Sequence, residues 1–205
     1  MKALSYIKWV VLAISLWAVA PAYGYQPTHD YYNRFRSPYR NNVYLSQQVN
    51  MARSDVNTGE GAAQRFDGYG LQLSAGLEHF RFIQTGAFFS TSQLNNNDNA
   101  ANEMRMIDSG IETKMVMSTP VSNIIVGAAG VISRANLNID GERLAASGTG
   151  IRGSFEVSYF ASSQVSLVVG ASHTMSKYSG KNGKGVEVKP ESRTTRLGAG
   201  LTVWL

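Results

Sequence analysis

The sequence predicts an all-β protein, namely an eight-stranded antiparallel up-and-down β-barrel that crosses a membrane. Three observations support this fold class. Apolar and polar residues alternate with a period of two along most of the chain after residue 42, which is typical of strands with two different faces. The alternating segments are about ten residues long, the length that a tilted strand needs to cross a bilayer. The connections between these segments are alternately long and short.

The first 24 residues predict an export signal. Lys2 and Lys8 precede an uncharged apolar run at residues 9–20, and the small residues that follow place the cleavage after Ala22 or Gly24. A helix of this run would rise only ~18 Å, which is too short to anchor the chain across the ~30 Å core of a bilayer. Residues 25–42, rich in Tyr and Arg, are expected to form a periplasmic tail, and residues 43–205 to form the barrel.

Alternation is strongest in the segments 69–78, 151–159 and 195–205, where odd positions are mostly apolar and even positions are small or polar. Trp204 is the large apolar exception on the even face of the last segment. Weaker alternation predicts five more strands. The eight expected strands are residues 43–52, 69–78, 80–91, 105–117, 123–133, 151–159, 164–176 and 195–205.

The connections predict which end of the barrel faces the periplasm. Short turns are expected around His79, at residues 118–120 and at residues 161–163. The other connections are rich in Asn, Gly, Asp, Ser and Lys and are expected to be long loops. These long loops are residues 53–65, 94–103, 134–150 and 177–193. Short periplasmic turns and longer external loops are typical of outer-membrane barrels.

Composition excludes several classes of chemistry. The chain has no Cys, so it has no disulfide, no thiolate metal site, no Cys nucleophile and no lipid-modified cysteine. Removing the export signal leaves 17 basic and 14 acidic residues, a net charge of +3, and charges this sparse do not indicate a nucleic-acid partner. Because no metal-ligand spacing, phosphate loop or dinucleotide motif occurs, we expect neither a metal nor a cofactor.

The uncharged odd faces are expected to contact lipid, because a charge near the middle of a bilayer costs ~2–4 kcal/mol. The alternative, a soluble lipocalin-like barrel with an internal ligand, would carry many more Lys and Glu on its exterior. Aromatic rings are expected at the two membrane interfaces. The expected interfacial residues are Tyr44, Phe80, Tyr159 and Phe160 at the periplasmic side and Tyr69, Phe88 and Phe89 at the other.

The even faces carry isolated charges, which are expected to pair inside the barrel because an unpaired buried charge is costly. These residues are Glu78, Glu112, Lys114, Arg152, Glu156 and Arg196. We expect a salt-bridge ladder that plugs the lumen; an ion or proton path is the alternative. The last long loop is basic and is expected to contact lipopolysaccharide phosphates or other acidic polymers. Its lysines are Lys177, Lys181, Lys184 and Lys189.

From residue 42 to the end, the chain resembles the small eight-stranded outer-membrane barrels of Gram-negative bacteria, the OmpA-barrel and OmpX-like superfamily. The resemblance rests on the architecture and on the alternating apolar last strand, residues 195–205 (TRLGAGLTVWL). It implies an outer-membrane location and insertion by the barrel-assembly machinery, which reads such a strand. The superfamily usually ends in Phe, whereas this chain ends in Val203-Trp204-Leu205.

The expected function is that of a non-enzymatic, monomeric barrel in envelope integrity or in surface recognition and adhesion, with a tail that is able to contact a periplasmic partner. One alternative is a lipid A-modifying enzyme, which needs a Ser beside a His base. His29 and His79 fall on the periplasmic side. His173 stands in a His-Thr-Met sequence, which does not resemble the His-x-Ser pattern of the lipid A deacylases among the small barrels. We therefore expect no catalytic residues. The second alternative is a narrow channel for ions or solutes.

Overall fold

The computed structural model describes residues 42–58, 63–79, 82–96, 99, 101–118, 122–139, 141–161, 164–181, 183 and 185–205. Its strands are β1 (Asn42–Asn57), β2 (Gln64–His79), β3 (Ile83–Asn96), β4 (Glu103–Ser118), β5 (Ser122–Ile139), β6 (Glu142–Phe160), β7 (Val165–Lys181), β8 (Glu187–Val188) and β9 (Glu191–Trp204). The predicted export signal lies outside the described residues, as does the predicted tail up to residue 41. No helix of the described part is long and apolar enough to cross a membrane.

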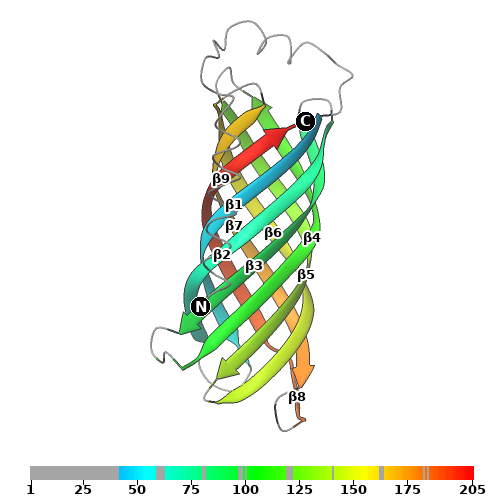
Figure 1. Cartoon of the computed structure of the whole chain (residues 1–205). Coiled ribbons are helices and arrows are strands. Elements are labelled where there is room, and N and C mark those ends of the chain that lie inside the picture. Colours follow the sequence, from blue (N-terminus) through cyan, green and yellow to red (C-terminus); the bar gives the residue numbers. More distant parts are fainter. Residues whose placement is uncertain are drawn as a thin grey trace, which may run out of the picture.

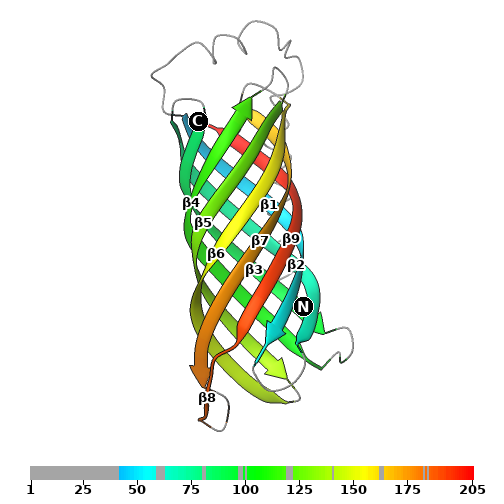
Figure 2. The same ribbon diagram turned by 180° about the vertical axis from the view of Figure 1, so that it is seen from behind.

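Eight long strands form one closed antiparallel barrel, which confirms the predicted fold class (Figures 1 and 2). The pairing order is β6-β5-β4-β3-β2-β1-β9-β7, and β6 pairs with β7 to close the ring; the two-residue β8 extends β7 at one end. Following the paired residues once around the barrel leads from Leu45 to Asp55 of the same strand, ten residues farther along (55 − 45). A stagger of this size requires strands tilted by ~40° to the barrel axis.

The strands are longer and the loops shorter than the sequence pattern predicts. The eight barrel strands contain 14 to 19 residues each, so much of the four expected long loops is strand. The largest error concerns residues 134–150, expected to be a loop: β5 and β6 run through it and leave only residues 140 and 141 between them. Gly141 has a φ of 83°, as a tight hairpin turn requires. The expected strict alternation of long and short connections is therefore wrong.

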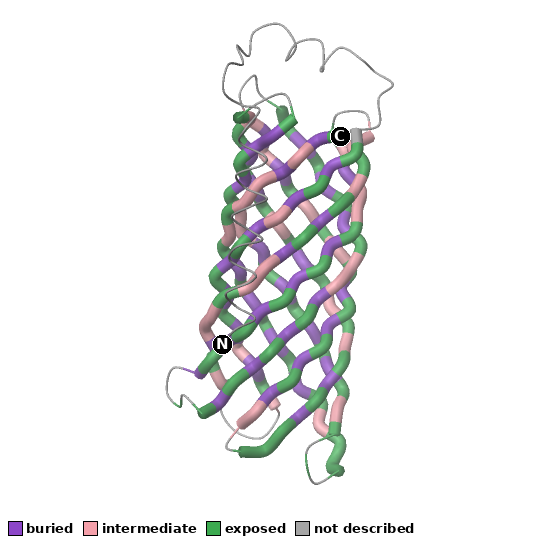
Figure 3. The backbone as a smooth tube through the Cα atoms, in the orientation of Figure 1, coloured by how far each residue is buried: buried purple, intermediate pink, exposed green. Residues whose placement is uncertain are grey.

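Both ends of the barrel can be recognised from its connections. We call the end that carries the connections β2–β3, β4–β5 and β6–β7, together with the chain's C-terminus, the turn end; it is uppermost in Figure 1. We call the opposite end, which carries β8 and the connections β1–β2, β3–β4 and β5–β6, the loop end. Exposed and buried residues alternate along every long strand between these ends (Figure 3).

The outer face of the barrel has an uncharged apolar zone near the turn end. We call it the apolar belt; it comprises the outward-facing residues of 43–51, 69–77, 83–91, 107–117, 124–132, 151–159, 167–175 and 195–203. Its large side chains, such as Leu45, Ile111 and Val169, are exposed, as the predicted odd faces require. Eight strand steps at ~3.3 Å and a tilt of ~40° rise ~20 Å, and the stagger between strands extends the belt to the ~25 Å of an outer-membrane apolar band.

A charged zone follows the belt toward the loop end. We call it the charged collar; it comprises Arg53, Asp55, Arg65, Asp67, Glu103, Arg105, Arg134, Glu142, Arg143, Lys177, Lys181, Glu187, Lys189, Glu191 and Arg193. Among the described residues, no outward-facing charge lies within the belt. The strands thus continue beyond the belt into a section whose outer surface suits water.

The prediction of an interfacial position is wrong for two of the aromatic residues, because their side chains point into the barrel. Tyr44 and Phe88 are buried. Tyr44 fits because two glycines face it: a Cβ on either Gly76 or Gly86 would lie 2.7 Å from the Tyr44 hydroxyl. Trp204, the predicted exception, is also buried, with its ring 5.8 Å from that of Tyr44.

The other expected interfacial aromatics fall into three groups. Tyr159 is exposed near the turn end of the belt, and Tyr69 is exposed near its collar edge, where each was expected. Phe89 is exposed nearer the middle of the belt. Phe160 is half-buried at the end of β6, and Phe80 lies outside the described residues.

Substitution of Ile111 by arginine is expected to destabilise the barrel in a bilayer. Ile111 is 74% exposed on the belt, and arginine at the middle of a bilayer costs ~2–4 kcal/mol. The matched control is Asn95→Arg, which adds the same charge to the outer face on the collar, between Asp67 and Glu103, and is expected to cost no more than ~0.5 kcal/mol in free energy of unfolding. Urea titration of folding in lipid vesicles measures both; equal losses would contradict the assignment of the belt to lipid.

Candidate functional site

The lumen inside the belt holds a compact ion cluster centred on Lys114. The Lys114 Nζ lies 3.1 Å from Glu112 Oε1 and 3.2 Å from Glu156 Oε1, and all three side chains are buried. The Tyr44 hydroxyl donates a hydrogen bond to Glu112 at 3.5 Å, and Lys114 Nζ lies 5.9 Å from the centre of the Tyr44 ring. One cation therefore bridges a carboxylate of β4 and a carboxylate of β6 inside the barrel.

A second ion pair lies nearer the loop end. The Arg196 guanidinium donates from Nη2 to Asp108 Oδ2 at 2.5 Å and from Nη1 to Thr174 at 3.2 Å. The Ser133 hydroxyl donates to the other oxygen of Asp108 at 2.6 Å. Asp108 was not among the predicted ladder residues, although its even number places it on the same face as Glu112 and could have identified it.

Arg152 lies in the lumen without a carboxylate partner. Its Nη2 donates to Gln72 Oε1 at 2.6 Å, and its guanidinium lies 4.7 Å from the centre of the Phe88 ring. Within the described part of the chain, no carboxylate oxygen lies within 4.0 Å of Arg152. An amide and an aromatic face thus support this cation, two contacts that the sequence pattern did not predict.

Five of the six predicted charges therefore form one ion cluster, one ion pair with an added partner and one separate cation, and the sixth, Glu78, lies apart from them. Glu112, Lys114 and Glu156 meet in the cluster, and Arg196 pairs with Asp108. Glu78 is half-buried at the turn end, where Gln84 donates a hydrogen bond to its carboxylate at 3.1 Å.

Little open space remains among these side chains. A cavity of about 10 Å³ lies between Gln48, Asn50, Gln72, Arg152 and Arg196, which is the size of about one water molecule. A passage for solutes needs a continuous opening, whereas here charged and amide side chains from strands on opposite sides of the barrel meet.

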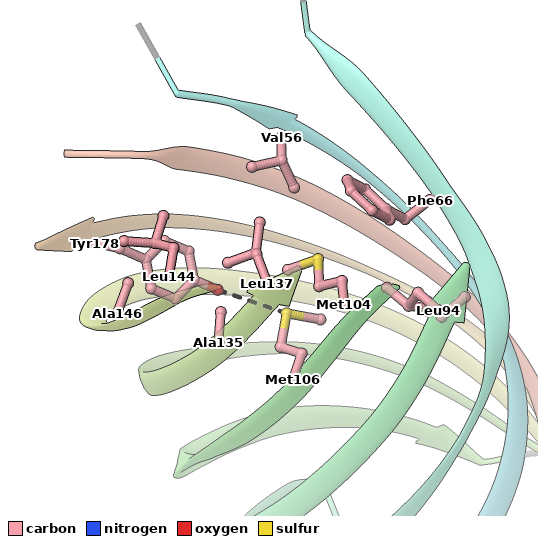
Figure 4. Packing of buried hydrophobic residues seen from close by; sticks show 11 residues of the cluster. Val56, Phe66, Leu94, Met104, Met106, Ala135, Leu137, Leu144, Ala146 and Tyr178 are labelled. Atoms are coloured by element: carbon pink, nitrogen blue, oxygen red, sulfur yellow. Dashed lines mark hydrogen bonds between the residues drawn. The ribbon is translucent and has the colours of Figure 1, made fainter. Parts of the chain in front are cut away.

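Beyond the polar lumen, at the loop end, the interior becomes apolar. We call this cluster the apolar plug (Figure 4); it comprises Ala52, Val56, Phe66, Leu94, Met104, Met106, Ala135, Leu137, Leu144, Ala146 and Tyr178. The Tyr178 hydroxyl donates to Met106 Sδ at 3.5 Å and accepts a hydrogen bond from Ser192 at 3.4 Å. Burial raises the pKa of the Tyr178 phenol, so this hydroxyl stays protonated at neutral pH.

At the collar edge of the belt, the inner face changes from polar to apolar and the outer face changes from apolar to charged. On β4, the inward-facing residues are Lys114, Glu112 and Asp108 within the belt and then Met106 and Met104 beside the collar. The outward-facing large residues of the same strand are Met115, Ile111 and Ile107 within the belt and then Arg105 and Glu103. Within lipid the exterior is apolar and the interior polar; in water a barrel needs an apolar core, and the second section has one.

Three of the four lysines predicted to contact anions lie on the collar, on the same side of the barrel. Lys177 Nζ lies 3.3 Å from Glu191, and Lys189 Nζ lies 3.5 Å from Glu187. Lys181 is exposed at the end of β7. Lys184 lies outside the described residues. Nearby carboxylates therefore offset part of the positive charge that the sequence places here.

His173 points outward from β7 within the belt, as its sequence parity predicts. One of its ring nitrogens, Nδ1, is 3.0 Å from the Thr195 hydroxyl on β9. Ser172 is buried on the opposite face of the strand, and Ser179 lies six residues along β7, or ~20 Å away. In the described residues, no group of three His, Asp or Glu side chains is arranged to hold a metal.

Comparisons with known proteins agree with this architecture. No protein-family model matches the chain, and no curated protein matches it in sequence. Neisserial surface protein A is similar in structure, with a TM-score of 0.58, 18% identity, and coverage of 78% of this chain and 96% of its own.

Two further solved structures are similar. OprG of Pseudomonas aeruginosa has a TM-score of 0.50 and 10% identity, with coverage of 80% of this chain and 96% of its own. AlkL, determined in lipid bilayers, has a TM-score of 0.50 and 11% identity, with coverage of 81% of this chain and 90% of its own. The chain therefore has the fold of the small eight-stranded outer-membrane β-barrels, as the resemblance to the OmpA-barrel and OmpX-like proteins implies.

Proposed function

We propose that the protein is a non-enzymatic, non-conducting barrel of the Gram-negative outer membrane that displays a rigid charged surface beyond the bilayer. The observation that carries this proposal is the exchange of polarity at the edge of the apolar belt. On the turn-end side of that edge the barrel suits lipid, and on the loop-end side the strands continue around the apolar plug with the charged collar outside. Such an extension serves surface recognition or envelope integrity, because it holds charged groups in fixed positions outside the membrane.

The closed lumen predicts that the protein does not conduct. We expect the processed chain, inserted in planar lipid bilayers, to give no stable openings above the baseline, because both the ion cluster and the apolar plug obstruct the barrel. A general porin in the same bilayer is the positive control. Large stable openings would contradict the proposal, and openings that change with Arg152→Ala or Glu112→Gln would favour the narrow channel.

The enzyme alternative is tested in cells. Lipid A from cells that express the protein is expected to have the same mass spectrum as lipid A from cells without it, and His173→Ala is expected to change nothing. Support for this expectation comes from His173, whose ring contacts Thr195 while Ser172 faces the lumen. A shift in lipid A mass that disappears in His173→Ala would overturn the non-enzymatic function.

Insertion by the barrel-assembly machinery and a monomeric state belong to the same proposal. The last strand, β9, keeps an outward-facing apolar row that includes Leu197, and Leu205 follows directly after the strand; such a row resembles the signal that this machinery reads. The closed ring supports a monomer, because all eight long strands are paired on both edges.

A further inference from the structure

The edge of the charged collar that adjoins the apolar belt differs from place to place around the barrel. On β1, β2 and β7 its basic residues are paired: Arg53 Nε donates to Asp67 at 2.6 Å, and Lys177 lies 3.3 Å from Glu191. On β4 and β5, Arg105 and Arg134 are both exposed, and neither has an ion-pair partner among the described residues.

The register places these two arginines side by side. Ile107 of β4 pairs with Arg134 of β5, and Arg105 pairs with Asn136, so the two arginines are diagonal neighbours on the outer face. Diagonal neighbours in a sheet are ~7–8 Å apart, which lets two long side chains converge on one ligand. Two like charges this close repel each other, and together they attract an anion. Glu103 lies two residues farther along β4, on the side away from the belt.

On the turn-end side of the arginines, the belt contains a low track of small residues, which begins beyond Ile132, a 62% exposed side chain between Arg134 and Gly130 on β5. Gly130 of β5 pairs with Ile111 on one side and Ile151 on the other, and Ala128 pairs with Gly153. A Cβ added to Gly130 or Gly153 would meet no atom within 4 Å, so the space above both is open. The neighbouring isoleucines are among the most exposed residues of the belt, and they rise on both sides of the track.

We propose that Arg105 and Arg134 bind the phosphate of an outer-leaflet lipid, with an acyl chain of that lipid lying on the Gly130 track. Guanidinium groups bind phosphate oxygens through paired charge-assisted hydrogen bonds, and both arginines stand where the apolar belt ends and headgroups begin. From Arg134 to Ala128 is six residues of β5, or ~20 Å of strand, which is the scale of a lipid chain. The acyl chain would pass beside Ile132, over the small Ser109 of β4 that pairs with it. This inference rests on the proposed outer-membrane location.

The test is native mass spectrometry of the folded chain in detergent, titrated with diphosphoryl lipid A or with a phosphate-free counterpart. The double variant Arg105→Gln with Arg134→Gln is expected to bind diphosphoryl lipid A at least ~10-fold more weakly than the original protein. The matched control is Arg65→Gln with Arg143→Gln, which removes the same charge from other parts of the collar and is expected to stay within ~2-fold. The phosphate-free lipid should bind all forms alike.

A third variant tests the acyl track. Gly130→Leu fills the open space without changing charge, and it is expected to weaken lipid A binding several-fold. Equal losses in the two double variants would mean diffuse electrostatic attraction and would overturn the site, as would unchanged binding by Arg105→Gln with Arg134→Gln. Heat-modifiable gel mobility verifies that each variant is folded. Failure of the outer-membrane proposal is distinguishable, because it would appear as failed bilayer insertion of every form, including the original.

Discussion

Replacing Lys114 with methionine is expected to cost ~3–5 kcal/mol in free energy of unfolding, the usual cost of removing one partner of a buried ion pair. Lys114 is the cation between Glu112 and Glu156, at 3.1 and 3.2 Å, and all three are buried within the belt. Methionine keeps the length of the side chain but leaves two carboxylates facing each other without a counter-charge. Urea titration of reversible folding in lipid vesicles measures the loss.

Two further variants separate the ion pairing from the packing. Combining Lys114→Met with Glu112→Gln and Glu156→Gln removes the uncompensated charge and is expected to recover most of the lost stability. Lys181→Met, the same substitution on the exposed collar, is expected to change stability by less than ~0.5 kcal/mol. If Lys114→Met is as stable as the original protein, the cluster is not what holds this part of the lumen together.

Truncating Phe66 to alanine is expected to cost a similar ~3–5 kcal/mol, because it removes a large side chain from a packed core and leaves a cavity. Phe66 is 0% exposed in the apolar plug, beside the collar and beyond the belt. Stability is lost for the same reason as in a soluble protein, because the plug is the apolar core of this section. Among the described residues, it is the only apolar cluster inside the loop end of the barrel.

Phe89→Ala is the comparison for Phe66→Ala, because it removes the same side chain from the lipid-facing belt, where Phe89 is 46% exposed. Its cost is expected to be smaller and to vary with bilayer thickness, whereas the cost of Phe66→Ala should not depend on the lipid. Unfolding in vesicles of short-chain and long-chain lipid measures both. Equal lipid dependence for the two variants would show that the plug lies within the bilayer and would refute the two-section description.

Strand parity allowed much of this molecule to be predicted. Because successive side chains of a strand point to opposite faces, Leu45, Ile111 and Val169 could be placed outside and Glu112 and Arg152 inside without any knowledge of pairing. The same parity also applied to Tyr44 and Phe88. They were misplaced because their position along the barrel axis was considered and their face was not.

Strand length was predicted less well. Polar residues were interpreted as loop, although the outer face of a strand in water is also polar, so the section beyond the belt was missed. The signal that could have revealed it is Asp140-Gly141, a common two-residue hairpin turn, between the apolar alternation of residues 135–139 and 144–146.

By itself, the sequence determined that this chain forms alternating strands with an uncharged outer face and isolated inner charges, because these properties depend only on neighbouring residues. Only the tertiary structure decided which inner charges meet. Lys114 reaches Glu156, 42 positions away, and Arg152 reaches Gln72, 80 positions away, through the ten-residue stagger of the closed barrel. The stagger sets the position of each side chain along the barrel axis relative to the side chains on the opposite wall. It results from the pairing of all eight long strands together.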